Sequence, residues 1–230
     1  MPDISGLETL IGLKFKEPKL LQQALVHRSY LNENPNFELD HNERLEFLGD
    51  AVLELIVTEH LYNTYPNPEG ELTNWRASLV NANNLALVGK ALGLEDYLYL
   101  SKGESKDKNT KARGYILANT IESLLGAIYL DQGYLACSQF VHKYILEKLP
   151  YILEHKLYLD AKTKFQEAAQ EKIGVTPTYS VIKETGPDHN KAFTVAVHIG
   201  GDQIAEGKGT SKQEAETAAA EAGLKAKRWE

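Results

Sequence analysis

Apolar residues recur at three- and four-residue spacing through most of the first two thirds of the chain, from Leu7 to Ile152. This is the periodicity of amphipathic helices. Examples are Leu20, Leu21, Ala24 and Leu25, and later Leu124, Leu125, Ile128 and Tyr129. Clusters of turn-forming residues interrupt the pattern and are expected to form loops at 32–42, 65–70 and 101–114. The segment is therefore predicted to be all helical.

The pattern changes after about Lys156. A helix is expected over 163–172, followed by runs of period two at 178–182, 193–199 and 203–206, with Gly, Asp and Asn turns between them. A last helix is expected to begin at Thr210 and Ser211, which are good N-cap residues, and to continue through an alanine-rich segment. The sequence thus predicts a mainly α protein: an all-helical domain over 1–155, a linker over 156–162 and a small α-β-β-β-α domain over 163–230.

Composition and the lengths of the apolar runs indicate where the protein is expected to be located. The 230 residues are 43% hydrophobic and 25% charged, enough apolar content for one large and one small domain. Apolar runs fall short of the roughly 20 residues that span a bilayer, and the N-terminus lacks the pattern of a secretory signal. We expect a cytoplasmic protein with no membrane partner. The single cysteine, Cys137, is expected to be a buried apolar residue rather than a reactive thiol.

The net charge of −7 and the pI of about 5.6 argue against a nucleic-acid partner, because proteins that bind polyanions are usually basic. The charge is unevenly distributed. From Asp160 onward there are 10 basic and 11 acidic residues, so the acidity lies mainly in the first 159 residues. A function on nucleic acid would have to explain this acidic first domain.

Three acids, Glu43, Glu46 and Asp50, stand at i, i+3 and i+7 and align on one face of a helix. Apolar residues occupy the other side: Leu45, Leu48 and Val52. Such like charges repel unless a cation joins them, and oxygen-only ligands suit Mg²⁺, which also takes phosphate oxygens. The chemistry indicated is phosphodiester hydrolysis, although by spacing alone a solvated helix face is the more common origin of this pattern.

The string NERLEFLGDAVL at 42–53 closely resembles the signature of the ribonuclease III family. The resemblance extends over essentially the whole chain, from LVHRSY at 25–30 through RASLV at 76–80 to the final alanine-rich helix. It implies a homodimeric endonuclease that requires Mg²⁺, for which Mn²⁺ is expected to substitute, and that cuts double-stranded RNA. It also implies products with 5′-phosphate and 3′-hydroxyl ends and short 3′ overhangs, and precursor ribosomal RNA and other structured transcripts as substrates.

The resemblance assigns roles to individual acids. Glu46 and Asp50 match metal ligands, and Glu122 matches the acid most essential to catalysis, so Asp50 and Glu122 are the expected catalytic pair. Asn119 stands where most members have Asp as a further metal ligand. An amide oxygen can still ligate Mg²⁺ or hold a coordinated water, so weaker metal binding is expected rather than lost activity. Two further acids match auxiliary positions near the RNA or the dimer boundary, or are simply exposed: Glu43 and Glu69.

Three other features of the first domain are interpreted through the same resemblance. Phe47 resembles the residue that inserts into the partner subunit of a twofold dimer, although a core position is equally compatible with the sequence. His27 is expected to make structural hydrogen bonds. A basic stretch is expected either to contact phosphate or simply to be solvated: Lys102, Lys106, Lys108, Lys111 and Arg113.

The C-terminal segment resembles a double-stranded-RNA-binding domain, which spans two minor grooves and the phosphates between them. The resemblance places Thr163, Gln166 and Glu167 at one minor groove and His189 at the second. The phosphate-binding region at 207–212 would use Lys208, Ser211 and above all Lys212. Gln213 and Glu214 depart from the usual basic cluster, so modest and salt-dependent affinity is expected.

Two other functions remain open from the sequence. One is a non-catalytic double-stranded-RNA-binding regulator whose metal site is impaired by Asn119; the presence of Glu46, Asp50 and Glu122 favours the enzyme instead. The other is an unrelated helical phosphohydrolase acting on small molecules, which would have no use for the C-terminal domain.

Overall fold

The computed structural model describes residues 4–106, 110–187 and 191–229. The chain divides into two compact units, one ending at Tyr158 and the other beginning at Leu159. Each unit has its own hydrophobic core.

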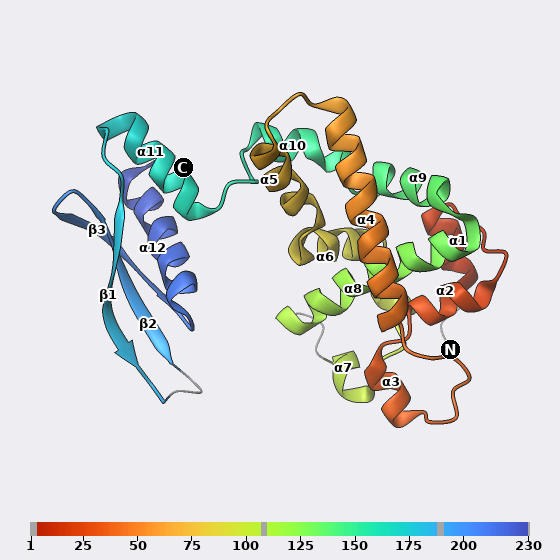
Figure 1. Ribbon diagram of the computed structural model, residues 1–230. Coiled ribbons are helices and arrows are strands. Elements are labelled where there is room, and N and C mark those ends of the chain that lie inside the picture. Colours follow the sequence, from red (N-terminus) through yellow and green to blue (C-terminus); the bar gives the residue numbers. More distant parts are fainter. Residues whose placement is uncertain (1–3, 107–109, 188–190, 230) are drawn as a thin grey trace. The chain divides into compact units, whose positions relative to one another are not determined.

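The first unit is helical (Figure 1). The two longest helices, α4 and α8, have 22 residues each. Helix α8 is buried over much of its circumference because α2, α4, α6 and α9 pack around it. The elements are α1 (Ile4–Ile11), α2 (Pro18–Ala24), α3 (Arg28–Glu33), α4 (Glu43–Thr64), α5 (Glu69–Val80), α6 (Ala82–Ala91), η1 (Leu94–Tyr97), α7 (Lys102–Lys106), α8 (Lys111–Gln132), α9 (Tyr134–Tyr144), η2 (Leu146–Lys148) and α10 (Leu149–Glu154).

Helices α4 and α8 approach each other so closely that their backbones touch. A Cβ atom added to Gly126 of α8 would lie 2.1 Å from the carbonyl oxygen of Leu45 in α4. Only glycine allows such an approach, because it has no side chain to separate the helices. The two helices that carry the candidate acids are therefore held at one fixed separation.

A small buried polar network fixes the start of α4. The Asn42 side-chain Nδ2 donates to the Ala24 carbonyl at 3.2 Å and to the Ser123 Oγ at 3.4 Å, and the Ser123 hydroxyl donates to the same carbonyl at 2.7 Å. Asn42 is 4% exposed and Ser123 is fully buried. Because buried polar groups are costly unless paired, this network holds the α4 N-terminus against α2 and α8.

The stretch 101–114 was expected to be a loop, but it contains α7 and the first turn of α8. Helix α8 begins at Lys111 because the Thr110 side chain accepts a hydrogen bond from the Arg113 N–H. Arg113 is only 3% exposed, and its Nη2 donates to the Glu104 carbonyl at 2.5 Å. Its expected phosphate contact is therefore wrong, whereas Lys102, Lys106 and Lys111 are exposed. Lys108 lies outside the described residues.

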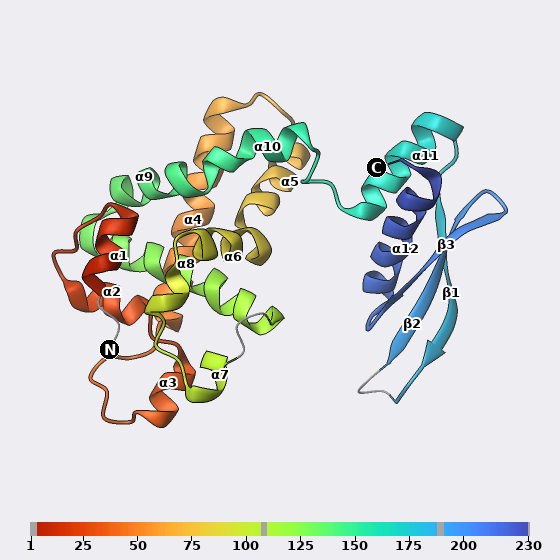
Figure 2. The ribbon, with the colours of Figure 1, turned by 180° about the vertical axis from the view of Figure 1, so that it is seen from behind.

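The second unit has the expected α-β-β-β-α order, which confirms the predicted fold class: α11 (Ala161–Ile173), β1 (Thr178–Thr185), β2 (Ala192–Ile199), β3 (Asp202–Gly209) and α12 (Lys212–Lys227). The sheet is antiparallel in the order β1-β2-β3, and both helices cover the same face (Figures 1 and 2). Phe165 packs there with apolar residues of β2 and α12. Helix α11 begins two residues earlier than expected because Asp160 caps the backbone N–H groups of Lys162 and Thr163.

Cys137 is fully buried in α9, and burial raises the pKa of its thiol to about 12. A thiol that stays protonated at neutral pH is a poor nucleophile, so the prediction of a small apolar core residue is confirmed. None of the helices in the described part of the chain is both long and apolar enough to cross a membrane.

Candidate active site

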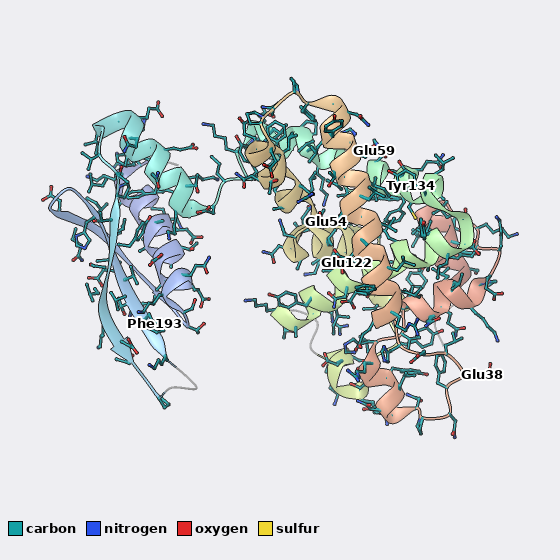
Figure 3. The ribbon with its side chains drawn as sticks, viewed as in Figure 1. Glu38, Glu54, Glu59, Glu122, Tyr134 and Phe193 are labelled. Carbon is teal, nitrogen blue, oxygen red and sulfur yellow. The ribbon has the colours of Figure 1, made fainter. Side chains whose placement is uncertain are left out.

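The central acids come from two touching helices. Glu46 and Asp50 lie one turn apart on α4, and Glu122 lies on α8, which passes directly beside α4 (Figure 3). Their charges interact, since both α4 carboxylates raise the pKa of Glu122. The structure therefore brings together the three acids that the sequence singled out.

Glu122 has the most strongly shifted carboxyl group of the cluster. Its pKa is raised from 4.5 to about 7, first by burial, then by Asp50 and then by Glu46. Burial and neighbouring negative charge both disfavour an ionised carboxylate. In the protein alone, this acid therefore holds its proton more tightly than an ordinary glutamate does, whereas a nearby cation would favour the ionised form.

Asn119 lies one turn before Glu122 on α8 and reaches toward α4. Burial and the charges of Glu43 and Asp50 raise the pKa of Glu46, while a hydrogen bond from the Asn119 side chain lowers it. Because a carboxylate can only accept here, the Asn119 amide must donate. The amide therefore partly stabilises the ionised form of Glu46, which an aspartate at the same position would not do.

The cluster fits a hard divalent cation by its donor chemistry. Its potential ligands are all oxygens, from Glu46, Asp50, Glu122 and the amide of Asn119. Within the described residues, there is no set of three His, Cys, Asp or Glu side chains already arranged as a ligand cage. The chemistry of the oxygen donors therefore favours Mg²⁺, since this ion keeps several waters and binds through few protein carboxylates.

The two auxiliary acids and Phe47 differ in where they lie. Glu43 is exposed and lies 3.5 Å from the Arg28 Nη1. Glu69 is exposed at the start of α5 and is not among the charges that shift Glu46 or Glu122. Phe47, between the α4 acids, is 82% exposed, so its interpretation as a core residue is wrong.

His27 forms the N-cap of α3, where its Nδ1 accepts a hydrogen bond from the Ser29 N–H at 3.3 Å. Burial lowers the pKa of its imidazole. A neutral ring is what this cap requires, because an imidazolium has no lone pair to accept the bond. The structure thus shows the structural hydrogen bond that was expected of His27.

The second unit presents several of the expected RNA-facing residues. Gln166 and Glu167 of α11, and Lys208 and Lys212 at the junction of β3 and α12, are exposed. The Thr163 hydroxyl instead donates to Asp160 Oδ2 at 2.8 Å, within the α11 cap. His189 lies outside the described residues.

Ser211 caps α12 by accepting from the Glu214 N–H at 3.1 Å, while the Glu214 carboxylate accepts from the Thr210 N–H at 2.8 Å. This pair is similar to a capping box, except that the carboxylate binds the N–H of the residue before the N-cap. Glu214 was expected only to weaken the attraction of phosphate, but its carboxylate also stabilises the start of α12. Gly207 and Gly209 face α12 closely, because a Cβ on either would lie 2.0 or 2.5 Å from that helix's backbone nitrogens.

The positioning residues were not identified from the sequence. These are Asn42 and Ser123, which fix the start of α4, and the two glycines at the α4–α8 contact, Gly49 and Gly126. A usable signal did exist for Ser123, since it is a polar residue inside an apolar stretch of α8. Such a residue needs a buried partner.

Comparison with known proteins covers both units. A ribonuclease-III-like domain matches residues 17–149, and a double-stranded RNA binding motif matches residues 161–227. Ribonuclease 3 of Borreliella afzelii is 43% identical over 217 residues, which cover 94% of this chain and 88% of the relative. Ribonuclease 3 of Desulforamulus reducens is 46% identical over 215 residues, covering 93% and 87%. The chain belongs to the ribonuclease III family.

The structural comparison gives the same ribonuclease III assignment for the helical unit. The nuclease domain of ribonuclease III from Campylobacter jejuni is similar with a TM-score of 0.58 and 35% sequence identity, over 64% of this chain and 99% of that one. It is described as flexible in a region involved in dimer formation. Ribonuclease III enzymes are metal-dependent nucleases, so the acid cluster across α4 and α8 lies in a metal-dependent ribonuclease with a double-stranded-RNA-binding domain.

Proposed function

We propose that this protein is a Mg²⁺-dependent endonuclease that hydrolyses double-stranded RNA, with Mn²⁺ able to substitute. Its products would have 5′-phosphate and 3′-hydroxyl ends with short 3′ overhangs, and its substrates would include precursor ribosomal RNA and other structured transcripts. The observation that supports this most is the juxtaposition of Glu122 with Asp50 and Glu46: burial first, and then these two negative charges, raise the pKa of Glu122 to about 7. Uncompensated negative charge of this kind marks a site built for a cation.

Four side chains would hold the cation: Glu46, Asp50, Asn119 and Glu122. When bound, Mg²⁺ would supply charge neutralisation and Lewis acidity at the scissile phosphate. Asp50 and Glu122 would face the reacting phosphate from two helices that are held at a fixed separation. Asn119 orients Glu46 through the amide hydrogen bond between them. Rigid placement of this kind is what positions a nucleophile and a leaving group.

The acidic first domain is compatible with an RNA substrate under this proposal. Mg²⁺ would neutralise the carboxylates, and exposed Lys208 and Lys212 of the second unit would meet phosphate. Lys212 also lies at the N-terminal, positive end of the α12 helix dipole, which favours an anion. Recognition by such a domain depends on A-form shape more than on sequence.

The exposed face of α4 supports a homodimer. Phe47 is 82% exposed, Leu55 58% and Tyr62 78%, and all three project from the same helix. Large apolar side chains in such a row are costly in water and mark a surface that a partner covers. We propose that a second copy packs here around a twofold axis, which would give two sites that cut opposite strands.

Cleavage of a long, perfectly paired RNA with and without Mg²⁺ tests this function, with Glu122→Gln as the matched variant. This change keeps the size of the side chain and removes its charge. We expect double-stranded cuts that need Mg²⁺, that are lost in Glu122→Gln, and that leave ends accepting a 3′ label without phosphatase treatment. Equal cleavage by the variant would exclude this site.

The same assay distinguishes the two alternatives. Binding of paired RNA without cutting over a wide range of Mg²⁺ and Mn²⁺ concentrations would identify a regulator whose metal site Asn119 has impaired. Hydrolysis of small phosphodiesters at a rate that excess paired RNA does not inhibit would identify a small-molecule phosphohydrolase. Neither outcome is expected.

A further inference from the structure

Two histidines face each other across a second contact of α4, far from the acid cluster. His60 of α4 and His142 of α9 have ring centroids 4.9 Å apart and ring planes at 87°. His60 is half-buried and His142 is exposed, so solvent reaches the pair. His60 comes ten residues after Asp50, which is about 15 Å along a helix. The pair is therefore separate from the candidate catalytic acids.

Other side-chain contacts near the two histidines hold α4 and α9 together. The Tyr134 hydroxyl of α9 donates to the Glu59 carboxylate of α4, and Figure 3 labels these two residues on neighbouring helices. His60 also packs edge-on against Tyr65, with ring centroids 6.4 Å apart. Because Glu59 is engaged with Tyr134, it is a partner of that tyrosine rather than of the imidazoles.

The two rings pack edge to face, and their spacing is also one that a shared cation would allow. A transition-metal ion binds an imidazole nitrogen at about 2.1 Å, which places it roughly 3.2 Å from the ring centroid. Two rings on one ion, at an angle between about 90° and 110°, would then have centroids roughly 4.5–5.2 Å apart. The observed 4.9 Å lies within this range.

We propose that His60 and His142 form a two-histidine site for a divalent transition cation such as Zn²⁺, which would join α4 to α9. Water would complete the coordination, because the described residues supply no third His, Cys, Asp or Glu to the pair. Imidazole nitrogen suits Zn²⁺, Cu²⁺ and Ni²⁺, whereas Mg²⁺ prefers oxygen. The site would thus select a different ion from the carboxylate cluster.

The protonation state of His60 favours this binding. A metal needs the neutral imidazole, since the charged ring has no free lone pair. Burial and the neighbouring His142 both lower the pKa of His60, so at neutral pH its ring is unprotonated. An ion that binds the folded protein and spans two helices stabilises the fold, because the unfolded chain does not hold the two rings together.

Calorimetric melting of the full chain with graded ZnCl₂ tests the proposal. We expect zinc in excess over its dissociation constant to raise the melting temperature of the helical unit by about 2 °C or more. MgCl₂ at the same concentration should produce no shift that depends on His60 and His142. His60→Gln and His142→Gln should each lose the zinc-dependent shift. The comparison is made within each variant, so a change in its starting stability does not affect the result.

Two control variants make the result specific. His155→Gln removes an exposed histidine that packs on Tyr151 with no second imidazole, and it should keep the zinc shift. Glu122→Gln disables the carboxylate cluster and should also keep it. The proposal is overturned if wild type shows no shift, if His142→Gln shifts as much as wild type, or if Glu122→Gln alone abolishes the effect.

Discussion

Gly49 of α4 lies directly against the backbone of Glu122 in α8: a Cβ atom at position 49 would be 1.7 Å from the Glu122 carbonyl oxygen. The next residue along α4 is Asp50, so the closest point between the helices coincides with the pair of candidate catalytic acids. A residue with any side chain would push the helices apart at this point. The interaction between Asp50 and Glu122 therefore depends on a glycine that carries no chemistry of its own.

Gly49→Ala should both destabilise the helical unit and abolish cleavage. The added methyl meets backbone atoms rather than a flexible side chain, so we expect a loss of about 3 kcal/mol or more in the free energy of unfolding, measured with urea. Gly114→Ala is the matched control, because a Cβ there meets only the Ala86 Cβ at 4.0 Å. It should stabilise α8 by about 0.5–1 kcal/mol. Wild-type stability in Gly49→Ala would contradict the close contact.

The raised pKa of Glu122 gives a pH dependence with a definite sign. Its value of about 7 in the folded protein exceeds the ordinary 4.5, so between these pH values the folded state binds the proton more tightly than the unfolded state does. Without metal, stability should therefore fall as pH rises from about 4.5 to 7. Urea unfolding in EDTA should show this fall in wild type and a weaker one in Glu122→Gln. Parallel pH profiles of the two proteins would contradict the assignment.

Asn119→Asp should lower the stability of the metal-free protein and raise its affinity for Mg²⁺. The change removes the hydrogen bond donated to Glu46 and adds a fourth negative charge, so in EDTA the variant should unfold at lower urea than wild type. With Mg²⁺, the extra charge should lower the concentration for half-maximal cleavage by roughly tenfold, the effect of about 1.4 kcal/mol. An unchanged Mg²⁺ requirement would show that Asn119 is not a ligand of the metal ion.

Phe47→Ala should weaken the dimer without harming the fold. Buried aromatic anchors contribute about 2 kcal/mol or more to an interface, so the dissociation constant should rise by roughly 30-fold or more. Because Phe47 is 82% exposed within one chain, the monomer should unfold like wild type. Leu135→Ala, on α9 and 76% exposed, is the control. Sedimentation that shows the same dimer in both variants would place the interface elsewhere.

The sequence was informative wherever local patterns determine structure. Helical spacing placed Glu46 and Asp50 on one face of α4, and alternation placed the three strands. It could not bring Glu122 to them without the family resemblance, because that pairing depends on the long-range contact at Gly49 and Gly126.

Two residues show why side-chain type alone was ambiguous. Arg113 looked like a basic loop residue and is buried, since α7 folds over it and supplies a carbonyl from Glu104. Phe47 looked equally suited to a core, yet it faces solvent within one chain. In both cases tertiary packing decided a question that the local sequence left open.

Lys212→Gln should weaken the binding of paired RNA to the same degree whatever its sequence. Lys212 is exposed in the first turn of α12, where its charge adds to the positive end of the helix dipole. Losing one phosphate contact should reduce the slope of log affinity against log salt by about 1. Lys225→Gln removes the same charge from the last turn of α12, about 20 Å away along the helix, and should leave the slope nearly unchanged. Binding measured at several salt concentrations separates the two, because a general effect of net charge would alter both variants equally, whereas a phosphate contact at the start of α12 alters only the first.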